Sequence, residues 1–147
     1  MQFTKNDGEN LETTGYFDKS LHPRVRLTVK GSRKSIPVAP VVDTGFDGDL
    51  CLPVEIAIQL GLELFGRSLV ELADGSKRRE LSFQGSVVWQ DQERLVEIYL
   101  TDSEEPLLGS GLMQRQKLTI GYANHFVTIE PDIIPDSGKR KKRKSRK

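Results

Sequence analysis

The stretch Val41-Val42-Asp43-Thr44-Gly45-Phe46-Asp47-Gly48 determines how the rest of this sequence is interpreted. Two β-branched residues, typical of a buried strand, lead directly into a carboxylate and then into a turn of small residues. Such a group can activate water: aspartate supplies a carboxylate, glycine leaves its backbone N–H free to approach it, and the threonine hydroxyl can brace the turn. The same residue types also form ordinary turns, so Asp-Thr-Gly alone assigns no function.

Upstream of this stretch the sequence predicts two extended segments. Val25, Leu27 and Val29 alternate with polar residues, as a half-buried strand requires, and the chain then turns at residues 31–32. The run 36–42 contains Pro37 and Pro40. Proline cannot donate to a ladder of hydrogen bonds, so this run is expected to be an irregular or edge strand.

Downstream, short strands and one or two short helices are expected. Pro53 opens and Gly61 closes an apolar-periodic segment, which predicts a helix of about two turns. The runs 69–73 and 81–89 flank Asp74-Gly75, a strong hairpin signal. Further strand-like runs cover 95–100, 118–122 and 126–129, and a second short helix is expected near residues 110–116. The fold class indicated is mainly β, a single compact β-barrel-like domain.

The two ends of the chain differ in composition from the middle. Residues 1–14 are expected to be a flexible leader, 15–135 the folded domain, and 136–147 a disordered basic tail. Lys139 to Lys147 contains eight basic residues in nine, while the rest of the chain holds 14 basic and 21 acidic residues. The net charge of +1 therefore hides an acidic body and a cationic tail. That tail can bind polyanions weakly and non-specifically, or simply keep the chain in solution.

Several classes of protein do not fit the sequence. The one cysteine, Cys51, cannot form an internal disulfide, and no signal-peptide-like run is found, so a cytoplasmic location is expected. No stretch approaches the roughly 20 apolar residues of a membrane span, so no membrane partner is expected. No cofactor or metal is predicted, because Cys51, His22 and His125 lack the spacing of a zinc site. Asp47 and Asp49 are expected to be solvated turn residues, because the glutamate of a calcium loop is missing.

Three landmarks, in this order, resemble the retropepsin-like (clan AA) aspartic proteases. They are Val42-Asp43-Thr44-Gly45, the hairpin at Ala73-Asp74-Gly75, and Leu107-Leu108-Gly109 followed by Leu112-Met113. The resemblance covers roughly Gly15 to Pro131. It is greatest to the small bacterial and archaeal branch, in which Asp-Thr-Gly-Phe and a later Leu-Ala-Asp-Gly occur. It implies a single-lobed, closed β-barrel with a flap hairpin.

The resemblance also implies a role for each landmark. Asp43 would be the catalytic acid, Thr44 would reach across to the loop of a partner chain, and Gly45 would lie against the carboxylate. Residues 73–75 would form the tip of a flap over the substrate, and residues 107–109 would thread behind the catalytic loop. Phe46 departs from the small residue often found after Asp-Thr-Gly in the viral enzymes. It would narrow the substrate cleft.

A single Asp-Thr-Gly predicts that two chains are needed. An aspartic protease holds two carboxylates around one water, and a twofold homodimer supplies the second Asp43. The predicted function is therefore an aspartic endopeptidase that acts on a peptide or protein substrate. The alternative is a catalytically silent binding module of the same fold, whose basic tail recruits an anionic partner. A nucleic-acid-binding barrel is disfavoured, because interleaved aromatic residues are missing.

Overall fold

The computed structural model describes residues 11–71 and 73–133 of the chain. The basic tail that the sequence predicts lies outside the described residues, as does most of the predicted leader. The strands are, in chain order, β1 (Thr13–Thr14), β2 (Tyr16–Phe17), β3 (Pro23–Arg24), β4 (Leu27–Lys30), β5 (Ser35–Val38), β6 (Val41–Val42), β7 (Leu50–Pro53), β8 (Glu63–Glu71), β9 (Lys77–Trp89), β10 (Gln92–Thr101), β11 (Leu107–Leu108), β12 (Gln116–Gly121) and β13 (Phe126–Pro131). The expectation of a mainly β chain is confirmed.

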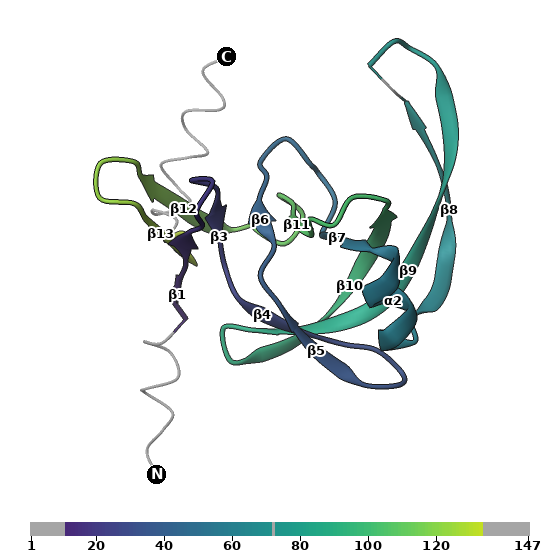
Figure 1. Cartoon of the computed structure of the whole chain (residues 1–147), viewed down its shortest axis with the longest axis horizontal. Helices are drawn as coiled ribbons and strands as arrows, with labels where there is room; N and C mark the ends of the chain where they lie inside the picture. The colour runs from purple at the N-terminus through teal and green to yellow at the C-terminus, as the bar shows by residue number, and fades with distance from the viewer. Residues whose placement is uncertain (1–10, 72, 134–147) are drawn as a thin grey trace, which may run out of the picture.

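Ten of these strands form one strongly curled sheet (Figure 1). Its order is β2-β3-β6-β11-β7-β10-β9-β4-β5, and β8 pairs with β9 beside this path. Within the described residues, β2 and β5 at the two ends do not pair with each other, so the expected closed barrel is not observed. Both end strands are poor templates for further pairing, since β2 has only two residues and β5 contains Pro37, which lacks a backbone N–H.

A second, three-stranded sheet has the order β1-β13-β12. Thr13 and Thr14, which lie inside the stretch expected to be a leader, pair with Ile129 and Thr128 of β13. Both threonines are β-branched and suit a strand. The ordered part of the chain therefore begins at least two residues before the expected domain start at Gly15.

The helix predicted from Pro53 and Gly61 is present as α2 (Val54–Leu60). Proline precedes its first residue, and Gly61 ends it in the left-handed conformation at φ 73°, with its N–H directed to the carbonyls of Ala57 and Ile58. The second helix expected near 110–116 is wrong, because the chain there forms successive turns. The N–H groups of Ser110 and Gly111 bond to the carbonyls of Phe46 and Gly48, which are distant in sequence, instead of taking part in a new helix.

The strands that carry the Asp-Thr-Gly loop contribute to the hydrophobic core. Val42, Leu50 and Leu108, from three neighbouring strands, are 8%, 0% and 0% exposed. Leu112, from the turns after β11, packs into the same cluster. Burial of each such side chain contributes about 1.5–3 kcal/mol. The strands that carry the loop are therefore anchored in the hydrophobic core.

The hairpin predicted at Asp74-Gly75 is present between β8 and β9. These strands pair from Glu63↔Gln84 to Glu71↔Lys77, with an irregularity between Leu64 and Gly66. Figure 1 shows the hairpin as a long ribbon that curves away from the body of the sheet. Its side chains are largely exposed, as Leu69 at 64% illustrates.

Candidate active site

Asp43 lies where β6 ends, at the start of the loop 43–49 that leads to β7. Its backbone N–H donates to the carbonyl of Leu108 over 2.9 Å. Its carboxylate is half-buried, and Oδ1 accepts a hydrogen bond of 2.9 Å from the N–H of Gly45. Both the backbone and the side chain of Asp43 are therefore held, as the Asp-Thr-Gly sequence predicts for a carboxylate turned into a loop.

The loop is fixed from behind by β11. This strand lies between β6, to which it is parallel, and β7, to which it is antiparallel. Beyond it, three successive N–H groups bond to loop carbonyls: Gly109 to Asp49 over 3.0 Å, Ser110 to Phe46 over 2.8 Å, and Gly111 to Gly48 over 2.9 Å. A Cβ added at Gly109 would lie 2.1 Å from the carbonyl oxygen of Gly48. The structure thus brings residues 107–109 together with the Asp43 loop.

Asp49 has a structural role that the sequence reading missed. It was expected to be a solvated turn residue, but it is half-buried, and its Oδ2 accepts a 3.0 Å hydrogen bond from the N–H of Glu97 on β10. This bond ties the end of the loop to a strand about fifty residues away. Asp47, by contrast, is exposed as expected. No local pattern in the sequence distinguishes the two, because the difference depends on where β10 packs.

Phe46 contributes to a cavity beside the loop. Its ring meets that of Tyr99 edge-on, with ring centroids 6.2 Å apart and an interplanar angle of 85°. The cavity has a volume of about 310 Å³ and is lined by Phe46, Asp47, Cys51, Glu80, Tyr99, Leu100 and Thr101. Glu80 and Tyr99, from β9 and β10, are lining residues that the sequence reading did not single out. They are brought here only by the pairing of distant strands.

Cys51, in the wall of this cavity, is not a nucleophile at neutral pH. Burial, with a smaller contribution from the charge of Glu80, raises the pKa of its thiol to about 11. The thiol therefore stays protonated across the physiological range. Cys51 therefore acts as a small buried hydrophobic residue.

Ala73, Asp74 and Gly75 form the turn at the end of the β8–β9 hairpin. Asp74 Oδ1 accepts hydrogen bonds from the side chain of Ser76, at 2.7 Å, and from its backbone N–H, at 2.9 Å, which together lower the pKa of Asp74. Gly75 has φ +90°, a conformation that favours glycine. Among the described residues, the structure shows no hydrogen bond between this turn, the expected flap tip, and the loop that carries Asp43.

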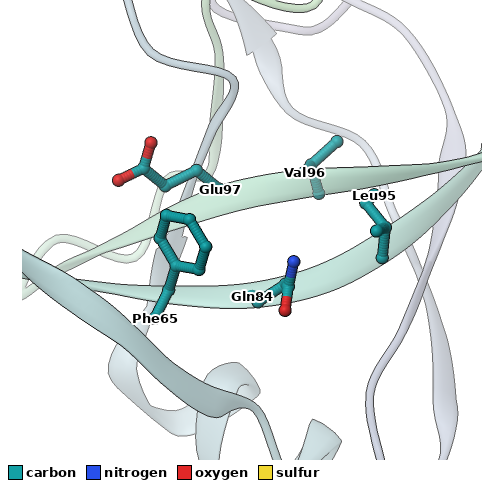
Figure 2. A pocket seen from close by; sticks show the side chains of 5 residues that line it. All are labelled: Phe65, Gln84, Leu95, Val96 and Glu97. Carbon is teal, nitrogen blue, oxygen red and sulfur yellow. The ribbon is translucent and has the colours of Figure 1, made fainter.

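A smaller cavity of about 160 Å³ lies where β8, β9 and β10 meet. Figure 2 shows its lining: Phe65 from β8, Gln84 from β9, and Leu95, Val96 and Glu97 from β10. None of these residues belongs to the loop 43–49 or to β11. The cavity nevertheless adjoins that loop through Glu97, whose N–H donates to Asp49 Oδ2.

Two further features concern the part of the chain that the structure describes. No group of three or more His, Cys, Asp or Glu side chains is placed to hold a metal ion there. No helix within those residues is long and apolar enough to cross a bilayer.

The comparisons with known proteins show a similarity of fold. No family model matches the chain, and no curated protein sequence does. Among solved structures, the fold is similar to that of a retropepsin-like aspartic protease from Rickettsia conorii, with a TM-score of 0.57. The two sequences are 22% identical, over 82% of this chain and 90% of that one. At that identity the likeness concerns the fold alone: this chain has a retropepsin-like fold.

Proposed function

We propose that this protein is an aspartic endopeptidase that works as a homodimer, with the two Asp43 carboxylates on either side of one water molecule. The observation that carries the proposal is the support of Asp43. Its N–H is held by Leu108 of the inserted strand β11, and its carboxylate is oriented by the N–H of Gly45. Asp43 Oδ2 has no hydrogen-bond partner among the described residues, so it is available to a water or to a second carboxylate.

The chemistry follows from two carboxylates at short range. Both cannot be ionised together, so the pair shares one proton. The ionised carboxylate takes a proton from the water as its oxygen attacks the peptide carbonyl carbon, while the protonated one donates a hydrogen bond to the carbonyl oxygen. Collapse of the tetrahedral intermediate then breaks the C–N bond, and the leaving amine takes a proton from the pair. No covalent intermediate with the protein forms.

A second chain is required because the sequence contains a single Asp-Thr-Gly. A twofold axis between two such loops generates the second carboxylate without further residues. Thr44 is exposed on this loop, and its hydroxyl makes no hydrogen bond within the described residues. In the proposed dimer, Thr44 would interact with the partner's loop.

The substrate would be an extended peptide lying between the Asp43 loop and the β8–β9 hairpin. Phe46 and the cavity that it lines would receive one of the substrate side chains. The turn Ala73-Asp74-Gly75 would have to approach the loop to close over the peptide, as a flap does. We further propose a cytoplasmic location, and weak polyanion binding through Lys139 to Lys147, both of which rest on the sequence alone.

The test is cleavage of a diverse peptide library from mildly acidic to neutral pH, with products identified by mass spectrometry. Asp43→Asn keeps the size of the side chain but removes the base, so hydrolysis should fall by about 10³-fold. The matched control is Asp91→Asn, in the exposed turn between β9 and β10, where asparagine also tolerates the positive φ of 62°. It should cleave like the wild type.

Two results would count against the enzyme. Cleavage at the same bonds by Asp43→Asn would place the chemistry elsewhere. Peptide binding without any cleavage in the wild type would favour the alternative, a silent binding module of this fold.

A further inference from the structure

Arg24, on β3, is a charged residue whose side chain lies largely inside the protein. The side chain is 13% exposed, and all three nitrogen positions of its guanidinium have acceptors. Nε donates to Asp18 Oδ2 over 2.6 Å and Nη1 donates to the carbonyl of Ala39 over 2.7 Å. Nη2 donates to Glu105. One side chain therefore joins three segments that are 6, 15 and 81 residues away.

Two of these acceptors lie just before the N-terminal ends of the strands that hold the active-site loop. Ala39 precedes β6 by two residues, and Glu105 precedes β11 by two residues. The starts of these two strands are also bonded to each other, since the N–H of Val41 donates to the carbonyl of Pro106 over 2.9 Å. Arg24 is itself the ladder partner of Val41. The guanidinium thus clamps β6 and β11 where their parallel pairing begins.

The other end of the same strand pair carries the candidate catalytic group. β6 and β11 pair as Leu107↔Val41 and Leu108↔Val42, and the next bond in this ladder is the one from the N–H of Asp43 to the carbonyl of Leu108. Each strand is only two residues long, and three residues separate Ala39 from Asp43 and Glu105 from Gly109. A shift of one strand against the other at Arg24 therefore moves Asp43 relative to its support.

From this arrangement we propose that Arg24 is a positioning residue for Asp43, which acts by fixing β6 against β11. The kinetic part of this inference rests on the proposed function, whereas the structural part does not. Arginine suits the task because its planar fork directs several N–H groups at fixed angles, which the single ammonium of lysine cannot do.

The partners of Arg24 are themselves held in place. Asp18 also accepts hydrogen bonds from the N–H groups of Ser20, at 2.8 Å, and His22, at 3.0 Å. The N–H of Glu105 donates to Ser103 Oγ, and the N–H of Ser103 donates to Thr101 Oγ1, both over 3.0 Å. The clamp is therefore connected to the end of β10 as well as to the turn between β2 and β3. Acceptors that are already ordered make the guanidinium a rigid link.

The kinetic test compares Arg24→Met and Arg24→Lys with Arg26→Met. Arg26 is an exposed neighbouring basic residue whose guanidinium lies over the ring of Tyr16, 4.1 Å from its centroid. For the folded Arg24→Met protein, kcat should fall by about 10–100-fold with KM changed less than about twofold, because misplacement affects the reacting group more than substrate binding. Arg24→Lys should lie between this variant and the wild type, and Arg26→Met should match the wild type. A lower unfolding midpoint with kcat unchanged would reduce Arg24 to a structural residue and overturn the proposal.

Amide hydrogen exchange tests the same idea without activity. In Arg24→Lys and Arg24→Met, exchange should accelerate at the N–H of Asp43 and of Gly109 by at least about tenfold more than at core amides such as Val87 and Val96. If Arg24→Met does not fold, Arg24→Lys and Glu105→Gln carry the measurement. If no Asp43-dependent cleavage is found but exchange changes in this pattern, the proposed function fails and the positioning role stands. Uniform acceleration at all amides, or none, would refute the positioning role.

Discussion

Gly45 and Gly109 both lie against the loop that carries Asp43, but the space around each differs. A Cβ at Gly109 would come within 2.1 Å of the carbonyl oxygen of Gly48 and within 2.6 Å of that of Phe46. Both are backbone atoms, which cannot move without shifting the loop. A Cβ at Gly45 would meet only Asp43 Oδ1, at 3.4 Å, which is an ordinary contact. Packing therefore requires a glycine at position 109, whereas Gly45 lies at the carboxylate itself.

This difference predicts that alanine at position 109 mainly lowers stability, whereas alanine at position 45 mainly lowers activity. Gly109→Ala should lower the free energy of unfolding by about 3 kcal/mol, because it overpacks a site with backbone on the far side. Gly45→Ala should change that free energy by less than about 1 kcal/mol, yet reduce peptide hydrolysis by about tenfold, because its methyl group displaces water from the carboxylate. Urea denaturation and peptide cleavage assays of both variants measure these effects. A Gly109→Ala protein as stable as the wild type would mean that β11 is not inserted as described.

Among the elements, the β8–β9 hairpin contains two glycines whose roles can be compared. Gly66 in β8 and Gly75 in the turn both have open space where a Cβ would be, but only Gly75 has a positive φ, of +90°. Valine is strained at such a φ and is favoured in a strand. Valine at Gly75 therefore tests the turn geometry, and valine at Gly66 tests only the effect of a larger side chain on the hairpin.

If the hairpin is a flap, Gly75→Val should lower peptide turnover by about tenfold or more while reducing the free energy of unfolding by only about 1–2 kcal/mol. Gly66→Val should leave both nearly unchanged. Steady-state kinetics beside thermal unfolding provide the measurement. Should turnover fall only in proportion to the folded fraction, the hairpin serves the scaffold and not the closing of the site.

The elements that the sequence predicted correctly are those with local signals. α2 has proline before it and glycine after it, and the β8–β9 hairpin has Asp74-Gly75 at its turn. The errors occur where the local structure or the burial of a residue depends on residues distant in the sequence. The turns after Ser110 replace a helix because their N–H groups bond to the loop at 46–48, and Asp49 is half-buried because Glu97 lies beside it. The open sheet likewise depends on which strands reach its two ends, which no local pattern encodes.

For the whole molecule, the sequence located the carboxylate and the strand behind it, because Asp-Thr-Gly and Leu-Leu-Gly each need a specific backbone geometry. It did not locate Glu80 or Tyr99 in the cavity wall, or Arg24 behind the loop, because those residues are brought there by pairing between strands far apart in the chain. The fold is similar to that of a solved structure although only 22% of the residues are identical, so the overall arrangement of strands does not depend on most individual residues. In the proposed enzyme, the second carboxylate would come from another molecule.

The proposed dimer makes activity depend on concentration. If two Asp43 side chains form one site, specific activity should rise with protein concentration and level off once dimers dominate, because the competent fraction follows mass action. Mixing equal amounts of wild type and Asp43→Asn should lower activity per wild-type chain by about half, since half of the wild-type chains then pair with a variant that cannot share the proton. Asp91→Asn, added at the same ratio, should have no such effect. Sedimentation measured beside the cleavage assay decides the question, because full activity at concentrations where only monomer sediments would rule out a site shared between two chains.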